Sequence, residues 1–176
     1  MSANQKDSLL TAARIVTILL TALALIIAVT GLFAMFAIPF NREAVLAELA
    51  LKDNSAAYGQ ILMALEIILA LVVAMAACAL NWLDSLRKII SSVSLGDPFA
   101  PANADRLQRM GWLTVAVELL AIPVGGIGSW LASVVKDATA EFGLSLGGIL
   151  LALVLFILAR VFRNGAEMRA ELEGTV

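Results

Sequence analysis

Two acidic residues lie inside long apolar stretches, and they are the first candidates for chemistry in this chain. Glu66 is the only charged residue between positions 54 and 83, and Glu118 is the only one between positions 110 and 135. At helical spacing each shares a face with Gly, Ala or Ser residues, which mark close helix approaches. Charged groups inside a membrane are costly and commonly belong to ion or proton paths. Both residues therefore form a candidate intramembrane polar site.

Two interpretations of these acids stay open. In the first, they relay a proton or a cation. In the second, they are structural and neutral, hydrogen-bonded to the hydroxyls of Thr17, Thr21 or Thr114 or to backbone carbonyls. No basic residue lies at a similar depth in any apolar stretch, which disfavours the charged form of either acid. The structural interpretation is favoured, because a transport path usually carries more polar residues than these stretches do.

Most other catalytic and metal-binding chemistry is excluded by residue type. His is absent and Cys78 is the single cysteine, so an internal disulfide, the usual His/Cys zinc sets and a Ser–His pair are all ruled out. No Gly-rich phosphate-binding loop occurs in the sequence. We therefore expect no enzyme, no catalytic residue, no cofactor and no metal site.

The composition indicates which elements must hold these residues. Apolar residues make up 61% of the 176 positions, charged residues make up 15%, and the mean hydropathy is +0.96. Soluble domains are roughly 45–50% apolar and about 25% charged. A soluble enzyme, a disordered chain and a nucleic-acid-coating protein are thus excluded, and the net charge of −2 indicates no direct nucleic-acid binding. The bilayer is the expected surrounding of this chain.

Four segments are long enough to cross that bilayer, because about 20 helical residues span a hydrocarbon core roughly 30 Å thick. The predicted transmembrane helices cover about 15–39, 58–83, 110–134 and 142–161. Nine of the twelve Lys and Arg residues fall beside the N-terminus, the second connection and the C-terminus. The positive-inside rule then places both termini in the cytoplasm. We expect an all-α membrane protein: one multi-pass domain over 1–176, folded as an N-in/C-in four-helix bundle.

The second connection, 84–109, is predicted to be a cytoplasmic helical hairpin. Gly96 is expected just after the first helix ends, Pro98 and Pro101 hold the turn, and Asn103 is expected to cap the returning helix. These prolines make the turn rigid, so it loses little entropy on binding a partner.

Four residues of this hairpin are candidate partner-binding residues: Asp97, Phe99, Arg106 and Arg109. The Phe99 ring either folds back onto Leu95 and Leu107 or anchors a partner, and folding back is favoured. Arg106 and Arg109 are expected to face outward one turn apart, where they can meet acidic groups or lipid phosphates.

Two motifs resemble a known bacterial family. The hairpin carries Leu95-Gly96-Asp97-Pro98-Phe99 followed by Asn103-x2-Arg106-Leu107-x3-Gly111-Trp112, and the C-terminal part carries Val161-Phe162-Arg163-x-Gly165-Ala166 and ends in Glu171-Leu172-Glu173-Gly174-Thr175-Val176. Together they are similar to the membrane-protein family called domain of unknown function 2975. The resemblance implies a four-helix, multi-pass protein of the bacterial cytoplasmic membrane, often encoded beside a small helix-turn-helix regulator of the Cro/C1 type. It implies no activity and no catalytic residue.

The expected function is a regulatory or scaffold protein that binds a cytoplasmic partner through its 84–109 hairpin and C-terminal tail, with the small helix-turn-helix regulator as the natural candidate. The alternative is a small transporter or channel component that uses Glu66 and Glu118. A weaker alternative is an accessory subunit that stabilises another membrane protein. Small residues at Gly143-x3-Gly147 in the last span also allow a homo-oligomer.

Overall fold

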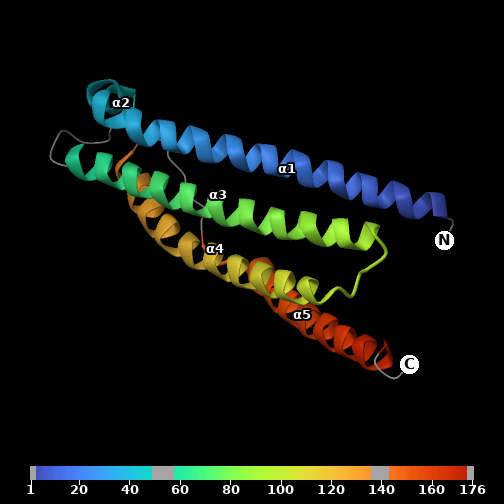
Figure 1. The fold of residues 1–176 in the computed structure, drawn as a ribbon. Coiled ribbons are helices and arrows are strands. Elements are labelled where there is room, and N and C mark those ends of the chain that lie inside the picture. The colour runs from blue at the N-terminus through green and yellow to red at the C-terminus, as the bar shows by residue number, and fades with distance from the viewer. Residues whose placement is uncertain (1–2, 49–57, 136–142, 174–176) are drawn as a thin grey trace.

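The computed structural model describes residues 3–48, 58–135 and 143–173, and its elements are helices. In chain order they are α1 (Ala3–Ala37), the 3-10 helix η1 (Ile38–Phe40), α2 (Arg42–Glu48), α3 (Tyr58–Ser94), α4 (Pro101–Val134) and α5 (Leu146–Glu173) (Figure 1). Among the described residues, α1, α3, α4 and α5 are long and apolar enough to cross a membrane. The expected number of spans is confirmed.

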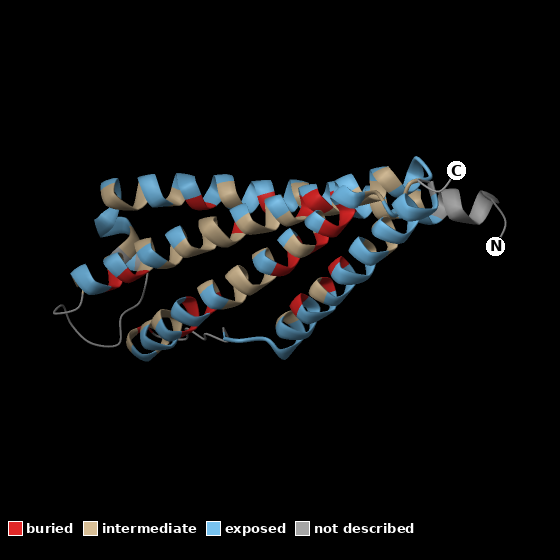
Figure 2. Ribbon diagram, turned by 60° about the horizontal axis from the view of Figure 1, so that its bottom comes forward, coloured by how far each residue is buried: buried red, intermediate tan, exposed pale blue. Residues whose placement is uncertain are grey.

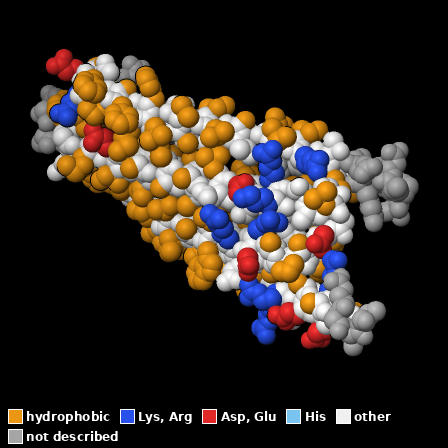
Figure 3. All heavy atoms as spheres, viewed as in Figure 1, with side chains coloured by type: hydrophobic (Ala, Val, Ile, Leu, Met, Phe, Trp, Pro, Cys, Tyr) orange, Lys and Arg blue, Asp and Glu red, His pale blue; other side chains and the backbone are white. Residues whose placement is uncertain are grey.

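The helices are longer than the expected spans, and the additional turns gather at one end of the molecule. There α1 begins, α3 ends, α4 begins and α5 ends (Figure 1). Figure 3 shows Lys and Arg side chains gathered over this half of the visible face, while apolar side chains cover the other half. We call it the charged end. Helix α5 continues to Glu173, twelve residues beyond the expected end of the fourth span, because the charged 163–173 segment remains helical.

The four long helices pack in chain order, each on the next long helix, and we call this arrangement the open row. Extensive packing joins α1 to α3, α3 to α4, and α4 to α5, whereas α1 and α5 share no extensive contact in the described ranges (Figures 1 and 2). No more than 28% of the residues in any span window are buried. Lipid chains are as apolar as Leu side chains, so burial alone does not drive such helices to close into a bundle.

The best-packed part of the interior joins α3, α4 and α5 near the charged end. Its buried members are Leu107, Met110, Leu155 and Ala159, with Trp82, Leu86, Ile89 and Phe162 packed around them. Gly111 permits the close approach of α4 to α5, because a Cβ there would lie 2.8 Å from the Phe156 ring. The Phe156 ring also meets Trp112 edge-on, with centroids 5.3 Å apart. This packing positions the hairpin described below.

Candidate functional site

The turn between α3 and α4 is held by one buried amide. Gly96 adopts a left-handed backbone with φ of 85° two residues after α3 ends, as expected for the residue that stops a helix. Asn103 is fully buried, and its Nδ2 donates to the Pro98 carbonyl at 2.9 Å and to Ser92 Oγ at 2.7 Å. Its Oδ1 accepts a hydrogen bond from Arg106 Nη1 at 2.8 Å. One side chain thus connects α3, the turn and α4.

This arrangement corrects the expected role of Asn103. Helix α4 begins at Pro101 with Ala100 in the cap position, so Asn103 lies inside the first turn and does not cap it. Pro101 supplies the fixed φ that favours helix initiation, which leaves the Asn103 amide available for the turn.

The end of α5 crosses the hairpin and is joined to it by two ion pairs, a ring contact and a hydrogen bond from Arg163 Nη2 to Gln108 Oε1 at 2.9 Å. Arg169 Nη1 lies 2.6 Å from Asp97 Oδ1, and Arg163 Nη2 lies 3.0 Å from Asp105 Oδ1. The Phe99 and Phe162 rings pack with centroids 5.4 Å apart. We call these residues the hairpin clamp: Asp97, Phe99 and Asp105 from the hairpin, and Phe162, Arg163 and Arg169 from α5.

Phe99 has a different partner from the one expected. Its ring packs on Phe162 and lies over Gly165 of α5, where a Cβ would come within 2.9 Å of it. Leu95, one of the two residues expected beneath the ring, is 82% exposed. The contact with α5 leaves Phe99 43% exposed, so the ring is half covered by its own chain.

Arg106 and Arg109 both hydrogen-bond to groups of α3, a contact that the sequence analysis did not predict. Besides Asn103, the Arg106 guanidinium donates to the Lys88 carbonyl at 3.4 Å. Arg109 Nη2 donates to Asn81 Oδ1 on α3 at 3.1 Å. Both arginines therefore link α4 to α3, because their long side chains reach across the short distance between the hairpin arms.

Three exposed apolar side chains of the turn and the end of α5, which we call the exposed apolar set, were missed by the sequence analysis. Leu95 in the turn, Met168 and Leu172 on α5 are 82%, 61% and 73% exposed. The ion pair between Asp97 and Arg169 brings this turn to the end of α5. The available signal was the pair of apolar positions four residues apart in the otherwise charged 163–173 segment.

Glu118 stabilises the start of α5. Its Oε2 accepts a hydrogen bond from the Ser145 backbone N–H at 2.8 Å, immediately before α5 begins at Leu146. The carboxylate also lies against Gly148, where any Cβ would overlap it. The first N–H groups of a helix lack partners and carry partial positive charge, so a carboxyl group there is favourable. The contact agrees with the structural interpretation favoured above, but its partner is a backbone N–H and not one of the expected hydroxyls or carbonyls.

Glu66 is separate from Glu118. It is half-buried on α3 and has no hydrogen bond or ion pair among the described residues. The expected hydroxyl partners bond within their own helices: Thr17 to Ala13, Thr21 to Thr17, and Thr114 to Met110. Among the described residues no group of three or more acidic or cysteine side chains could hold a metal ion.

Comparison with known proteins places a family over the entire chain. The sequence model of the family described as "Protein of unknown function (DUF2975)" matches residues 2–176. No curated protein and no solved structure matches the chain.

Proposed function

Because the chain belongs to the family "Protein of unknown function (DUF2975)", whose description assigns no activity, we propose its function from the geometry of the charged end. The protein is a membrane-embedded scaffold or regulator that presents its α3–α4 turn and the end of α5 to a protein partner. It performs no catalysis of its own.

The hairpin clamp is the observation that carries this proposal. Each exposed ion pair alone contributes little, about 0–1 kcal/mol. Together with the Phe99–Phe162 contact, however, they fix two segments that are far apart in the sequence into one rigid unit. A linker between two spans needs no such unit. A preorganised surface loses less entropy on binding, which suits a docking site.

The charged end faces the cytoplasm of a bacterium in this proposal. Nine of the twelve basic residues belong to the segments that meet there, and such an excess favours the cytoplasmic side of the inner membrane. The clamp is then accessible to soluble cytoplasmic proteins.

The partner recognises the exposed apolar set of Leu95, Met168 and Leu172. These side chains are mostly exposed and stand among charged neighbours, as in the apolar centre and polar rim of a protein interface. The resemblance supplies the candidate, a small helix-turn-helix regulator encoded beside the gene. Holding such a regulator at the membrane would remove it from its DNA.

A direct binding measurement tests the proposal. The full chain is reconstituted in lipid nanodiscs, and binding of the purified neighbouring regulator is measured by interferometry. Burial of a Leu side chain contributes about 1.5–3 kcal/mol, so Leu95→Ser with Leu172→Ser should weaken binding at least tenfold. Both positions are exposed, and the double variant should keep the thermal stability of the wild type.

The matched control changes two exposed leucines at the start of α5, away from the hairpin clamp, Leu144→Ser and Leu146→Ser, and should leave the affinity unchanged. Absence of regulator binding to the wild type, or equal loss in both double variants, contradicts the proposal. If the wild type forms a dimer and the Leu95/Leu172 double variant is a monomer, the exposed apolar set binds a second copy of the chain instead.

Glu66 supports a second candidate, a transporter or channel component, because this acid lacks a bonding partner among the described residues. The hydrogen bond of Glu118 to the start of α5 weakens that alternative by giving one of the two acids a structural role. Proton or cation flux into proteoliposomes that Glu66→Gln abolishes without loss of folding would favour transport over docking.

A further inference from the structure

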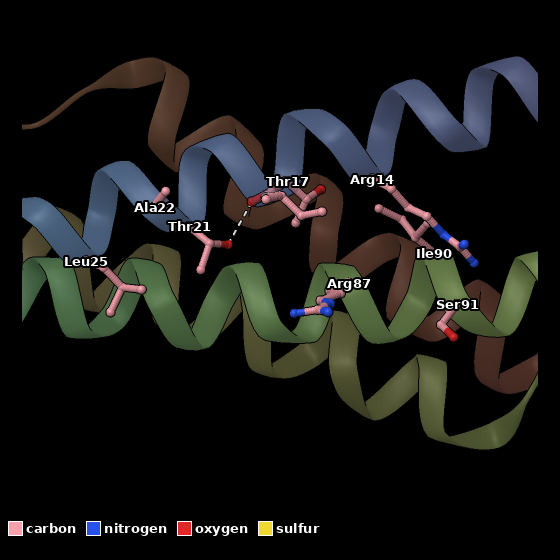
Figure 4. Close-up of a pocket in the computed structure, with 9 residues that line it drawn as sticks. Arg14, Thr17, Thr21, Ala22, Leu25, Arg87, Ile90 and Ser91 are labelled. Carbon is pink, nitrogen blue, oxygen red and sulfur yellow. Dashed lines mark hydrogen bonds between the residues drawn. The ribbon is translucent and has the colours of Figure 1, made fainter.

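A cavity of about 620 Å³ lies between α1 and α3 at the charged end (Figure 4). Residues of both helices line it: Arg14, Thr17, Ile18, Thr21, Ala22 and Leu25 from α1, and Arg87, Ile90 and Ser91 from α3. Most of these residues are exposed, so the cavity is a groove that opens sideways at the surface of the row. Its volume is within the range of about 300–1,000 Å³ typical of small-molecule sites.

The charged side chains that line this groove are both basic. Arg14 and Arg87 stand on opposite walls, and no acidic residue lines the groove. Arg87 has no hydrogen bond or ion pair among the described residues, and Arg14 donates from Nη2 to Ser94 Oγ at 2.7 Å. The nearest acid along α3, Asp84, is paired with Lys88 at 2.6 Å. Two guanidinium groups therefore keep donors for an anion, and phosphate oxygens match their geometry.

The rest of the groove is apolar and has the length of one lipid leaflet. Ile18, Ala22 and Leu25 continue from Arg14 along one side of α1, and the hydroxyls of Thr17 and Thr21 are turned to carbonyls of their own helix. The eleven residue steps from Arg14 to Leu25 rise about 16 Å along the helix axis. Half of a hydrocarbon core roughly 30 Å thick has nearly the same length.

We propose that this groove binds an anionic phospholipid of the surrounding bilayer. The headgroup phosphate lies between Arg14 and Arg87, within reach of the Ser91 hydroxyl, and an acyl chain lies along Ile18 and Leu25. A free phosphate would bind the two arginines but would leave the apolar part of the groove empty. A zwitterionic lipid would fill the groove, but its headgroup has no net negative charge for the two arginines to attract. The site depends only on membrane insertion and is independent of partner docking at the hairpin clamp.

Lipid retention tests the assignment. The full chain is extracted in a mild neutral detergent, supplied with equal amounts of phosphatidylglycerol and phosphatidylcholine, and examined by native mass spectrometry. We expect preferential retention of phosphatidylglycerol. Arg87→Gln should reduce that retention about fivefold, and Arg14→Gln with Arg87→Gln more than tenfold. Each basic residue close to an anionic headgroup adds a similar attraction, so the second substitution adds to the loss caused by the first. Arg87→Gln removes no bond of the described structure, so it separates lipid binding from folding.

The control carries the same loss of charge elsewhere. Arg42→Gln with Arg160→Gln changes two exposed arginines outside the groove and should retain phosphatidylglycerol like the wild type. Equal retention of the two lipids by the wild type, or equal losses in the groove and control variants, overturns the proposal. The proposal is also overturned if inorganic phosphate alone raises the melting temperature as much as phosphatidylglycerol does. In that case the two arginines bind free phosphate.

Discussion

Replacing Asn103 with Ala should loosen the entire α3–α4 turn. The side chain is fully buried and takes part in three hydrogen bonds, to Pro98, Ser92 and Arg106. A hydrogen bond contributes about 0.5–1.5 kcal/mol net, and a buried group left without its partner costs about 1–3 kcal/mol. The Pro98 carbonyl and the Arg106 guanidinium both lose a partner. We expect a loss of about 3 kcal/mol for opening the turn.

Hydrogen exchange measured by mass spectrometry reports this opening locally. Because about 1.4 kcal/mol corresponds to a factor of ten in an opening equilibrium, amides of the 92–106 segment should exchange about a hundredfold faster in Asn103→Ala. The amides in the middle of α1 should not change, since the three side-chain hydrogen bonds of Asn103 go to α3, the turn and α4.

Asn164→Ala is the matched control, because Asn164 is exposed on α5 and has no bond in the described structure. It should exchange like the wild type. Exchange of the 92–106 segment within twofold of the wild type in Asn103→Ala would refute the reasoning that this amide holds the turn together.

Three further predictions concern the other contacts. Glu118→Ala should lower the thermal midpoint in detergent while Glu118→Gln, which keeps an acceptor for the Ser145 N–H, should not; equal midpoints would contradict the role of Glu118 at the start of α5. Gly165→Val should displace the Phe99 ring and destabilise the clamp by about 1–3 kcal/mol, seen as faster exchange at 97–105, whereas Gly126→Ala, with open space around it, should have no such effect. In a Cys78→Ser background, Leu95→Cys at the charged end should be protected from impermeant thiol reagents in intact cells. Arg42→Cys, exposed at the start of α2 beyond the other end of α1, should react; the reverse pattern would invert the proposed orientation.

The sequence predicted the four spans and the hairpin because both depend on local patterns. Hydropathy and charge define where an apolar helix can cross a membrane. Gly96 with Pro98 and Pro101 indicates a turn from the local sequence alone. The contacts between residues far apart in the chain could not be predicted from such local patterns. Phe99 meets Phe162 and Asp97 meets Arg169 only because α5 continues past the expected span and crosses the hairpin, which depends on how the spans lie against each other.

The two acids illustrate the same limit. Its position inside an apolar stretch singled out Glu118, but its hydrogen-bond partner, the Ser145 N–H, is 27 residues away and depends on how α4 and α5 pack. The open row was also beyond sequence patterns, because apolar side chains gain as little from each other as from lipid. Hydropathy therefore predicts the number of membrane-spanning helices but not which helices pack together.

The open row has a consequence for how the protein is assembled in the membrane. Each long helix packs extensively only on the long helix before or after it in the chain. During synthesis every new span therefore finds its partner already inserted, and no span must wait for one made much later. The contacts that span the greatest distances in the sequence lie outside the apolar segments, between Arg14 and Ser94 and between the hairpin and the end of α5. The turns at the end of α5, made after all four apolar segments, thus fasten a structure whose membrane part is already in place.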